Sequence, residues 1–180
     1  MIQKTIVRSW NIIREHRVVF MIGTLLPSII GIFLAETVMV IQFNTLQPIL
    51  GGITFITVEA LGACLIDFPM SVLAGFIIAG KTGTSSLENG ALAGASFLTV
   101  FILLVACAGG ILHRFAGFVD VFGLGDAALF AAQIAWQQFG YRFAVIMFMF
   151  LVADYLLCML GGILGFMIIR LIHYPATEES

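Results

Sequence analysis

The chain has 180 residues, of which 61% are hydrophobic and only 10% are charged, and its formal net charge is −2. A soluble domain carries about 25% charged residues, so this composition excludes an ordinary water-soluble domain and predicts an integral protein of the cell membrane. Because no basic excess exists beyond the first residues, nucleic acid is not an expected partner, and no residue pattern indicates a cofactor.

Residues 1–17 are predicted to form a short amphipathic helix that lies on the cytoplasmic surface of the membrane. Its polar and apolar side chains separate onto two faces at helical spacing. The polar face carries Lys4, Arg8, Asn11 and Glu15, and the apolar face carries Ile6, Trp10 and Ile13.

The first half of the chain is expected to occupy residues 18–80. An apolar run from Val18 to about Phe43 predicts the first membrane span. Residues 44–80 are apolar but are interrupted by prolines, glycines and acids. We therefore expect an irregular segment on the outer side, followed by a second span that ends at Lys81.

The second half is expected to occupy residues 90–172, after a polar loop and before a polar tail at 173–180. Apolar runs at 90–112 and 141–172 predict the third and fourth spans. If 115–140 lies at the outer surface or re-enters the membrane, the distribution of Lys and Arg places both termini in the cytoplasm. If 115–140 crosses the membrane, the C-terminus lies outside; the polar residues of this segment favour the first alternative. The prediction is an all-α, four-span protein with one membrane domain, 1–180.

A weak internal repeat is compatible with this division. VLAGFIIAGK, residues 72–81, resembles GGILGFMIIR, residues 161–170, and each follows an acid, Asp67 or Asp154. Two such halves predict a parallel repeat, which is a recurrent architecture of transporters. The alternative is that two helices rich in Gly and Ile resemble each other by composition.

The stretch GFIIAGKT, residues 75–82, matches the phosphate-loop pattern G-x-x-x-x-G-K-[ST]. Here the pattern lies inside an apolar run, where a phosphate loop would expose unpaired N–H groups to hydrocarbon. No nucleotide is therefore expected. The glycines are interpreted as packing positions and Lys81 as an anchor at the cytoplasmic side.

GLGD, residues 123–126, resembles the G-x-G-D motif of intramembrane aspartyl proteases of the presenilin and prepilin-peptidase type. That resemblance implies a second aspartate opposite Asp126, for which Asp67 or Asp154 is available. Asp154-Tyr155 reverses the Tyr-Asp order of presenilins, and their Pro-Ala-Leu element is absent. VFGLGD is also similar to potassium-filter sequences. The structural alternative is a turn at Gly123 and Gly125, with Asp126 capping a following helix.

Glu59, Asp67 and Asp154 are acids in apolar stretches that have no Lys or Arg at matching depth. A charged carboxylate inside a bilayer costs about 2.5–3.5 kcal/mol on insertion scales. These residues are therefore candidates for an ion or proton path. The alternative is a structural role, as neutral acids hydrogen-bonded to residues such as Thr57 or Tyr155.

The remaining patterns indicate packing and not chemistry. Small residues at four-residue spacing, Gly90 with Gly94 and Gly161 with Gly165, predict close helix contact, within this chain or in a homo-oligomer. Cys64, Cys107 and Cys158 are interpreted as small buried hydrophobes, and no metal site is expected. The predicted function is non-enzymatic: a channel- or transporter-like protein, or alternatively an accessory subunit of a larger membrane complex.

Overall fold

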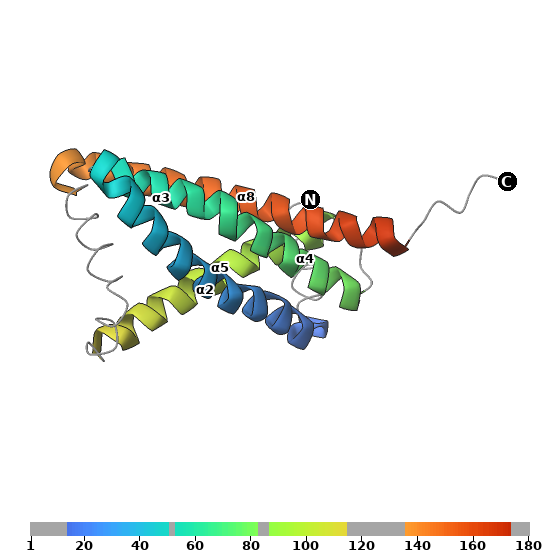
Figure 1. Cartoon of the computed structure of the whole chain (residues 1–180). Coiled ribbons are helices and arrows are strands. Elements are labelled where there is room, and N and C mark those ends of the chain that lie inside the picture. Colours follow the sequence, from blue (N-terminus) through green and yellow to red (C-terminus); the bar gives the residue numbers. More distant parts are fainter. Residues whose placement is uncertain (1–13, 51–52, 83–86, 115–135, 174–180) are drawn as a thin grey trace.

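The computed structural model describes residues 14–50, 53–82, 87–114 and 136–173, and within these ranges the chain is helical (Figure 1). The elements, in chain order, are α2 (Arg17–Leu50), α3 (Thr54–Gly62), the π-helical turn η2 (Ala63–Asp67), α4 (Phe68–Thr82), α5 (Leu87–Arg114) and α8 (Tyr141–His173).

Within the described residues, four helical stretches are long and apolar enough to cross a membrane, as the sequence predicts for this part of the chain. They cover Arg17–Ala35, Ile56–Thr82, Leu87–Val105 and Tyr141–Ile172, with mean hydropathies of 2.4, 2.0, 1.7 and 2.4.

Two expected boundaries in the first half are wrong. α2 does not end near Phe43 but continues to Leu50, so Pro48 lies in its last turn, next to a pair of glycines that are weak helix formers. The segment expected to be irregular is helical from Thr54 onward, and α3, η2 and α4 form one continuous helical stretch. Hydropathy alone placed these ends poorly because the apolar run continues through both of them.

The helices alternate in direction between two ends of the molecule. At one end, named here the Lys81 end, α2 begins, α4 ends, α5 begins and α8 ends (Figure 1). At the other, the Arg142 end, α5 ends and α8 begins. Residues 115–135, with Gly123, Gly125 and Asp126, lie outside the described residues, so whether this segment crosses the membrane stays a prediction.

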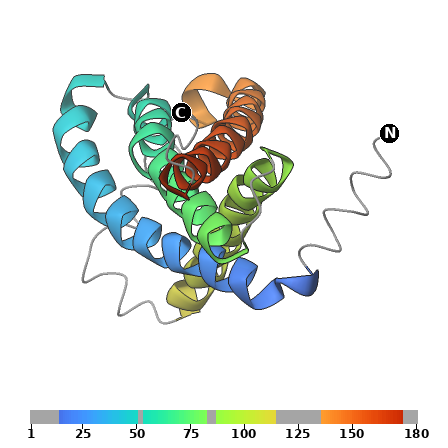
Figure 2. The ribbon, with the colours of Figure 1, turned by 90° about the vertical axis from the view of Figure 1, so that its right-hand side faces the viewer.

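The helices meet closely in the half of the molecule near the Lys81 end and diverge toward the Arg142 end. α8 makes its most extensive contacts with α4 and α5, and α2 packs against α4 and α5. In both views the far end of α5 lies well apart from α3 and from the start of α8 (Figures 1 and 2).

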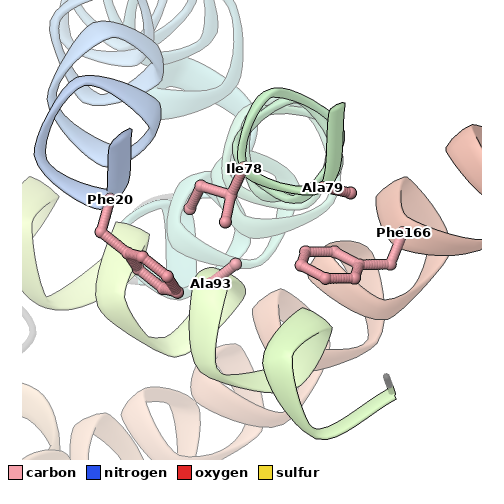
Figure 3. Close-up of a cluster of buried hydrophobic side chains, with 5 residues drawn as sticks. All are labelled: Phe20, Ile78, Ala79, Ala93 and Phe166. Atoms are coloured by element: carbon pink, nitrogen blue, oxygen red, sulfur yellow. The ribbon is translucent and has the colours of Figure 1, made fainter. Parts of the chain in front are cut away.

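Two layers of buried side chains fill the half near the Lys81 end. The layer nearer that end joins all four long helical stretches and consists of Phe20, Ile78, Ala79, Ala93 and Phe166 (Figure 3). The next layer consists of Ala74, Phe97, Leu98 and Cys158. By contrast, residues 141–157 of α8 include no buried position.

Glycines allow the backbones of α4 and α8 to touch. A methyl group at Gly75 would overlap the carbonyl group of Gly162, and one at Gly165 would overlap the backbone of α4 at Val72 and Phe76. A methyl group at Gly161 would collide with the Ser71 hydroxyl. Such approach requires residues without a β-carbon.

The same face of α8 also meets α5 through glycines. A methyl group at Gly94 would overlap the carbonyl group of Cys158, and one at Gly90 would lie 2.8 Å from the Cα atom of Ile163. Gly162 contacts both neighbours: its carbonyl group lies against Gly75 of α4, and its own added methyl group would overlap the backbones of Gly90 and Gly94 in α5. α8 is thus held between two helices at backbone contact.

The predicted repeat remains a prediction. Residues 72–81 and 161–170 lie on α4 and α8, which run in the same direction and pack together. A parallel repeat requires this arrangement, but any two successive helical hairpins also produce it.

Candidate functional site: two carboxyl groups between η2 and α8

Asp67 and Asp154 come together in the structure. Asp67 is the last residue of η2, Asp154 lies inside α8, and their side chains are hydrogen-bonded to each other. Both residues are half-buried. Two acids that are far apart in the sequence therefore form one site, at the level where the closely packed half of the molecule ends.

A hydrogen bond between two carboxyl groups requires a hydrogen atom, because an ionised carboxylate only accepts. At least one of the two groups must therefore be protonated when they are bonded, as in paired aspartates whose like charges lie too close for both to ionise. The arrangement can take up or release a proton with the movement of a single hydrogen.

Cys158 lies one helical turn from Asp154, on the side of the carboxyl pair that is nearer the Lys81 end. Its thiol is fully buried and donates a hydrogen bond to Asp154 Oδ1, with 3.7 Å between Sγ and Oδ1. The side chain of Ser71 interacts with the same thiol, while the Ser71 hydroxyl donates to the Phe68 carbonyl oxygen at 2.6 Å. Asp154 therefore accepts a hydrogen bond from the buried thiol of Cys158 as well as contacting Asp67.

The turn that carries Asp67 is a π-helix. The Phe68 N–H donates to the Ala63 carbonyl oxygen, which is five residues back instead of four. Pro69 follows directly, and in a regular α-helix its ring would clash with the carbonyl group of Leu65. The widened turn places Asp67 at an interruption of the helix, where π-helical turns are frequent at functional sites.

Apolar side chains separate the carboxyl pair from the Lys81 end. Next to the pair, on the side of the Lys81 end, lies the layer that contains Phe97 and Cys158, against which Met70 and Phe101 pack. The rings of Phe97 and Phe101 lie 5.8 Å apart. The layer around Phe166 follows (Figure 3). At about 1.5 Å per residue, Asp67 lies roughly 21 Å from Lys81 along the helix.

A second polar contact joins α5 to α8 near the pair. The hydroxyl oxygens of Thr99 and Tyr155 are 3.0 Å apart, and Thr99 donates its hydrogen to the Ala95 carbonyl oxygen at 2.9 Å. Tyr155 is therefore the donor to Thr99. Tyr155, which the sequence offered as a partner for an acid, pairs with this threonine in the structure.

Two other residues of the sequence prediction, Glu59 and its possible partner Thr57, both lie in α3. The side chain of Glu59 is outside the described residues, and Thr57 donates instead to the Ile53 carbonyl oxygen at 3.1 Å. Within the ranges that the structure describes, no group of three or more His, Cys, Asp or Glu could hold a metal ion.

Sequence reasoning missed Ser71 and Cys158 as parts of the site. Cys158 is buried and free of disulfides, as predicted, but it also hydrogen-bonds an acid. The same prediction was wrong for Cys64, which is exposed. A signal for Ser71 and Cys158 was present in the spacing, because each follows its acid by four positions and so shares a helix face with it.

Comparisons with known proteins give no relative. No protein-family model matches the chain, and neither a curated protein nor a solved structure matches it significantly.

Proposed function

We propose that the chain is a small, channel- or transporter-like integral membrane protein in which Asp67 and Asp154 line a path for protons or other cations. The observation that carries the proposal is the contact between these two carboxyl groups. Paired carboxyls within apolar helices are a costly arrangement, and intramembrane acids commonly mark ion and proton pathways.

The outer surface of α8 supports the membrane assignment. Along its length this helix exposes large apolar side chains, including Val145, Phe148, Met149, Leu156, Leu160 and Leu171. In water these side chains would form an extended apolar patch, which soluble monomers rarely carry. In a bilayer the same surface faces lipid at no cost.

The depth of the pair supports a functional role. Asp154 lies 12 positions beyond Arg142, about 18 Å at helical rise. A charged carboxylate at such depth costs about 2.5–3.5 kcal/mol. Sharing one proton reduces two such charges to one, and the Cys158 thiol stabilises the charge that remains.

The distribution of cations supports an orientation. Of the described Lys and Arg residues, those at the Lys81 end are Arg14, Arg17, Lys81 and Arg170, and those at the Arg142 end are Arg114 and Arg142. Cytoplasmic segments carry the excess of Lys and Arg. The Lys81 end is thus the cytoplasmic one in this proposal, and both termini are cytoplasmic.

The arrangement of the helices then suggests the direction of access. Two apolar layers lie between the carboxyl pair and the cytoplasmic end, while the helices diverge toward the outer end (Figure 1). In this state, protons or cations reach the pair from the outer side. Transfer to the cytoplasm requires a second state in which the layers part.

An accessory or structural subunit is the second candidate. It is favoured by the outer half of α8, which has no buried position and could pack against another subunit or a second copy of this chain. In that case the carboxyl pair holds two helices together and transports nothing.

Flux measurements separate the two candidates. The purified protein is reconstituted in liposomes that contain a pH-sensitive dye, and proton flux is compared for wild type, Asp67→Asn and Asp154→Asn. Each substitution removes one exchangeable proton site but keeps the side-chain shape, so we expect at least a tenfold loss of flux.

Glu88→Gln is the matched control, since this exposed acid lies in the first turn of α5, away from the pair. It is expected to retain wild-type flux. Unchanged flux in Asp154→Asn, with thermal stability preserved, contradicts the transport proposal. If the wild type carries no flux and Asp154→Asn disrupts assembly, the accessory-subunit candidate is supported.

A further inference from the structure

A proton and a metal cation make opposite demands on a pair of carboxyl groups. A metal cation is held by several oxygen atoms that direct lone pairs at one point; Ca²⁺ takes about six to eight such ligands and Mg²⁺ about six. In a membrane, K⁺ exchanges its water shell for a ring of carbonyl oxygens. A proton needs only two acceptors that are close enough to share it. The placement of hydrogen atoms around the pair therefore distinguishes the two kinds of ion.

Hydrogen atoms point into the carboxyl pair between η2 and α8. The side chains of Asp67 and Asp154 are hydrogen-bonded to each other, which places a hydrogen between two of their oxygens. The Cys158 thiol donates a second hydrogen to Asp154 Oδ1, with 3.7 Å between Sγ and Oδ1. A metal cation would need the lone pairs that these hydrogens engage, and the partial positive charge of each hydrogen would repel it.

The neighbouring helices hold the thiol in this position. Cys158 is fully buried, in one layer with Phe97. Its carbonyl group lies so close to α5 that a methyl group at Gly94 would overlap it. From α4, the side chain of Ser71 interacts with the thiol itself. Because α8 is in backbone contact at this residue, the sulfur atom stays beside Asp154.

The other described groups around the pair bring no further charge and no metal site. α2 and α5 contain no acid or base in residues 18–35 and 89–105. Ser71 of α4 and Tyr155 of α8 present neutral hydroxyl groups, which bond to a carbonyl oxygen and to a threonine. No group of three or more His, Cys, Asp or Glu in the described ranges could hold a metal ion. Within these ranges, the two carboxyl groups and the Cys158 thiol therefore determine which ion is bound.

We propose that the carboxyl pair binds protons and excludes metal cations, and that the Cys158 thiol contributes to this choice by donating its hydrogen to Asp154. This inference rests on the proposed function for its consequence, which is that the path carries protons and not Na⁺, K⁺ or Ca²⁺. The binding preference itself does not depend on transport, so it is measured separately.

Infrared spectroscopy of the whole chain in liposomes measures the binding preference. A protonated carboxyl group absorbs apart from a carboxylate, and the part of the acid band that is lost in Asp154→Asn is assigned to the pair. The pH at which this band disappears is compared in Na⁺, K⁺, Ca²⁺ and choline salts at equal ionic strength, and we expect no difference. A cation that binds the carboxylates displaces the proton and would lower this pH by about one unit for each tenfold rise in its concentration. Such a shift overturns the proposal.

Cys158→Ala tests the part of the thiol, and Cys64→Ala is the matched control because that cysteine is exposed. A hydrogen bond donated to the ionised form of a carboxyl group favours that form. Without the thiol, the acid band is therefore expected to persist to a higher pH, by roughly half a unit or more. Cys158→Ser keeps a donor and should move the band less. An unchanged band in Cys158→Ala, or an equal shift in Cys64→Ala, overturns the role of the thiol.

Transport is then measured in the same liposomes with a pH-sensitive dye and with radioactive Na⁺. The wild type is expected to pass protons at the same rate in Na⁺, K⁺ and choline media, and to take up no more Na⁺ than Asp154→Asn does. If Na⁺ uptake depends on Asp154, the transport function stands and the proton preference fails. If the wild type carries neither ion but the acid band ignores the metal cations, the preference stands and the proposed transport function fails.

Discussion

The two halves of the bundle are built from equally apolar helices but are packed in different ways. Near the Lys81 end, glycines bring the backbones of α4, α5 and α8 into contact and two layers of side chains are buried. Toward the Arg142 end, α8 buries no described position between residues 141 and 157. Hydrophobicity therefore does not distinguish the halves; the distribution of small residues does.

This difference follows from the physics of helix association in lipid. Apolar side chains gain little by leaving lipid for a protein neighbour, so association depends on close packing and on polar contacts. Near the Lys81 end the glycines lie at backbone contacts between helices, whereas a methyl group at Gly62, toward the Arg142 end, would meet no atom within 4 Å. The carboxyl pair lies at the border of the closely packed half, next to the buried layer that contains Cys158.

The largest expected difference between the halves concerns phenylalanine. Phe166 is 1% exposed and Phe148 is 66% exposed on the same helix. Phe166→Ala should lower the free energy of unfolding by about 3 kcal/mol, because it leaves a cavity in a packed layer. Phe148→Ala should change it by less than about 0.5 kcal/mol.

Thermal or denaturant unfolding in detergent micelles measures both variants. Equal losses in the free energy of unfolding would contradict the difference in packing between the two halves. A large loss at Phe148 in the membrane alone would indicate that another subunit or a second copy covers this face of α8.

Glycine substitutions test the close packing more finely. Gly162→Ala should cost about 2 kcal/mol, because the added methyl group meets the backbones of Gly90 and Gly94 and forces the helices apart. Gly62→Ala, where nothing lies within 4 Å, should instead be neutral or stabilise by up to about 1 kcal/mol. The melting temperatures of the two variants should thus move in opposite directions or differ clearly; a similar loss in both would mean that the glycine contacts do not hold α8.

The smallest expected effect concerns the polar contact between α5 and α8. Tyr155→Phe removes the hydrogen bond to Thr99 and should destabilise the protein by about 0.6 kcal/mol, the average for interhelical hydrogen bonds in a membrane. Thr99→Val should give a similar loss, and the double variant should cost no more than either single one. Additive losses in this double-mutant cycle would show that the two hydroxyl groups do not interact.

Part of the site could be anticipated from residue type and spacing. Asp67 and Asp154 were identifiable as acids in apolar surroundings, and each has a polar or thiol group four positions later on the same helix face. Their contact with each other could not be anticipated, because it depends on which helices become neighbours. The helix boundaries near Phe43 and Thr54 were also misplaced, since uniform hydropathy carries no signal for where one helix stops.

Local patterns of hydropathy and charge were sufficient to predict the four helical stretches able to cross a membrane that the described residues contain, because such a stretch needs only about 20 consecutive apolar residues. The pairing of two carboxyl groups emerged only from the folded arrangement. It requires the glycine contacts that set the register of α4 on α8, and these contacts join residues far apart along the chain.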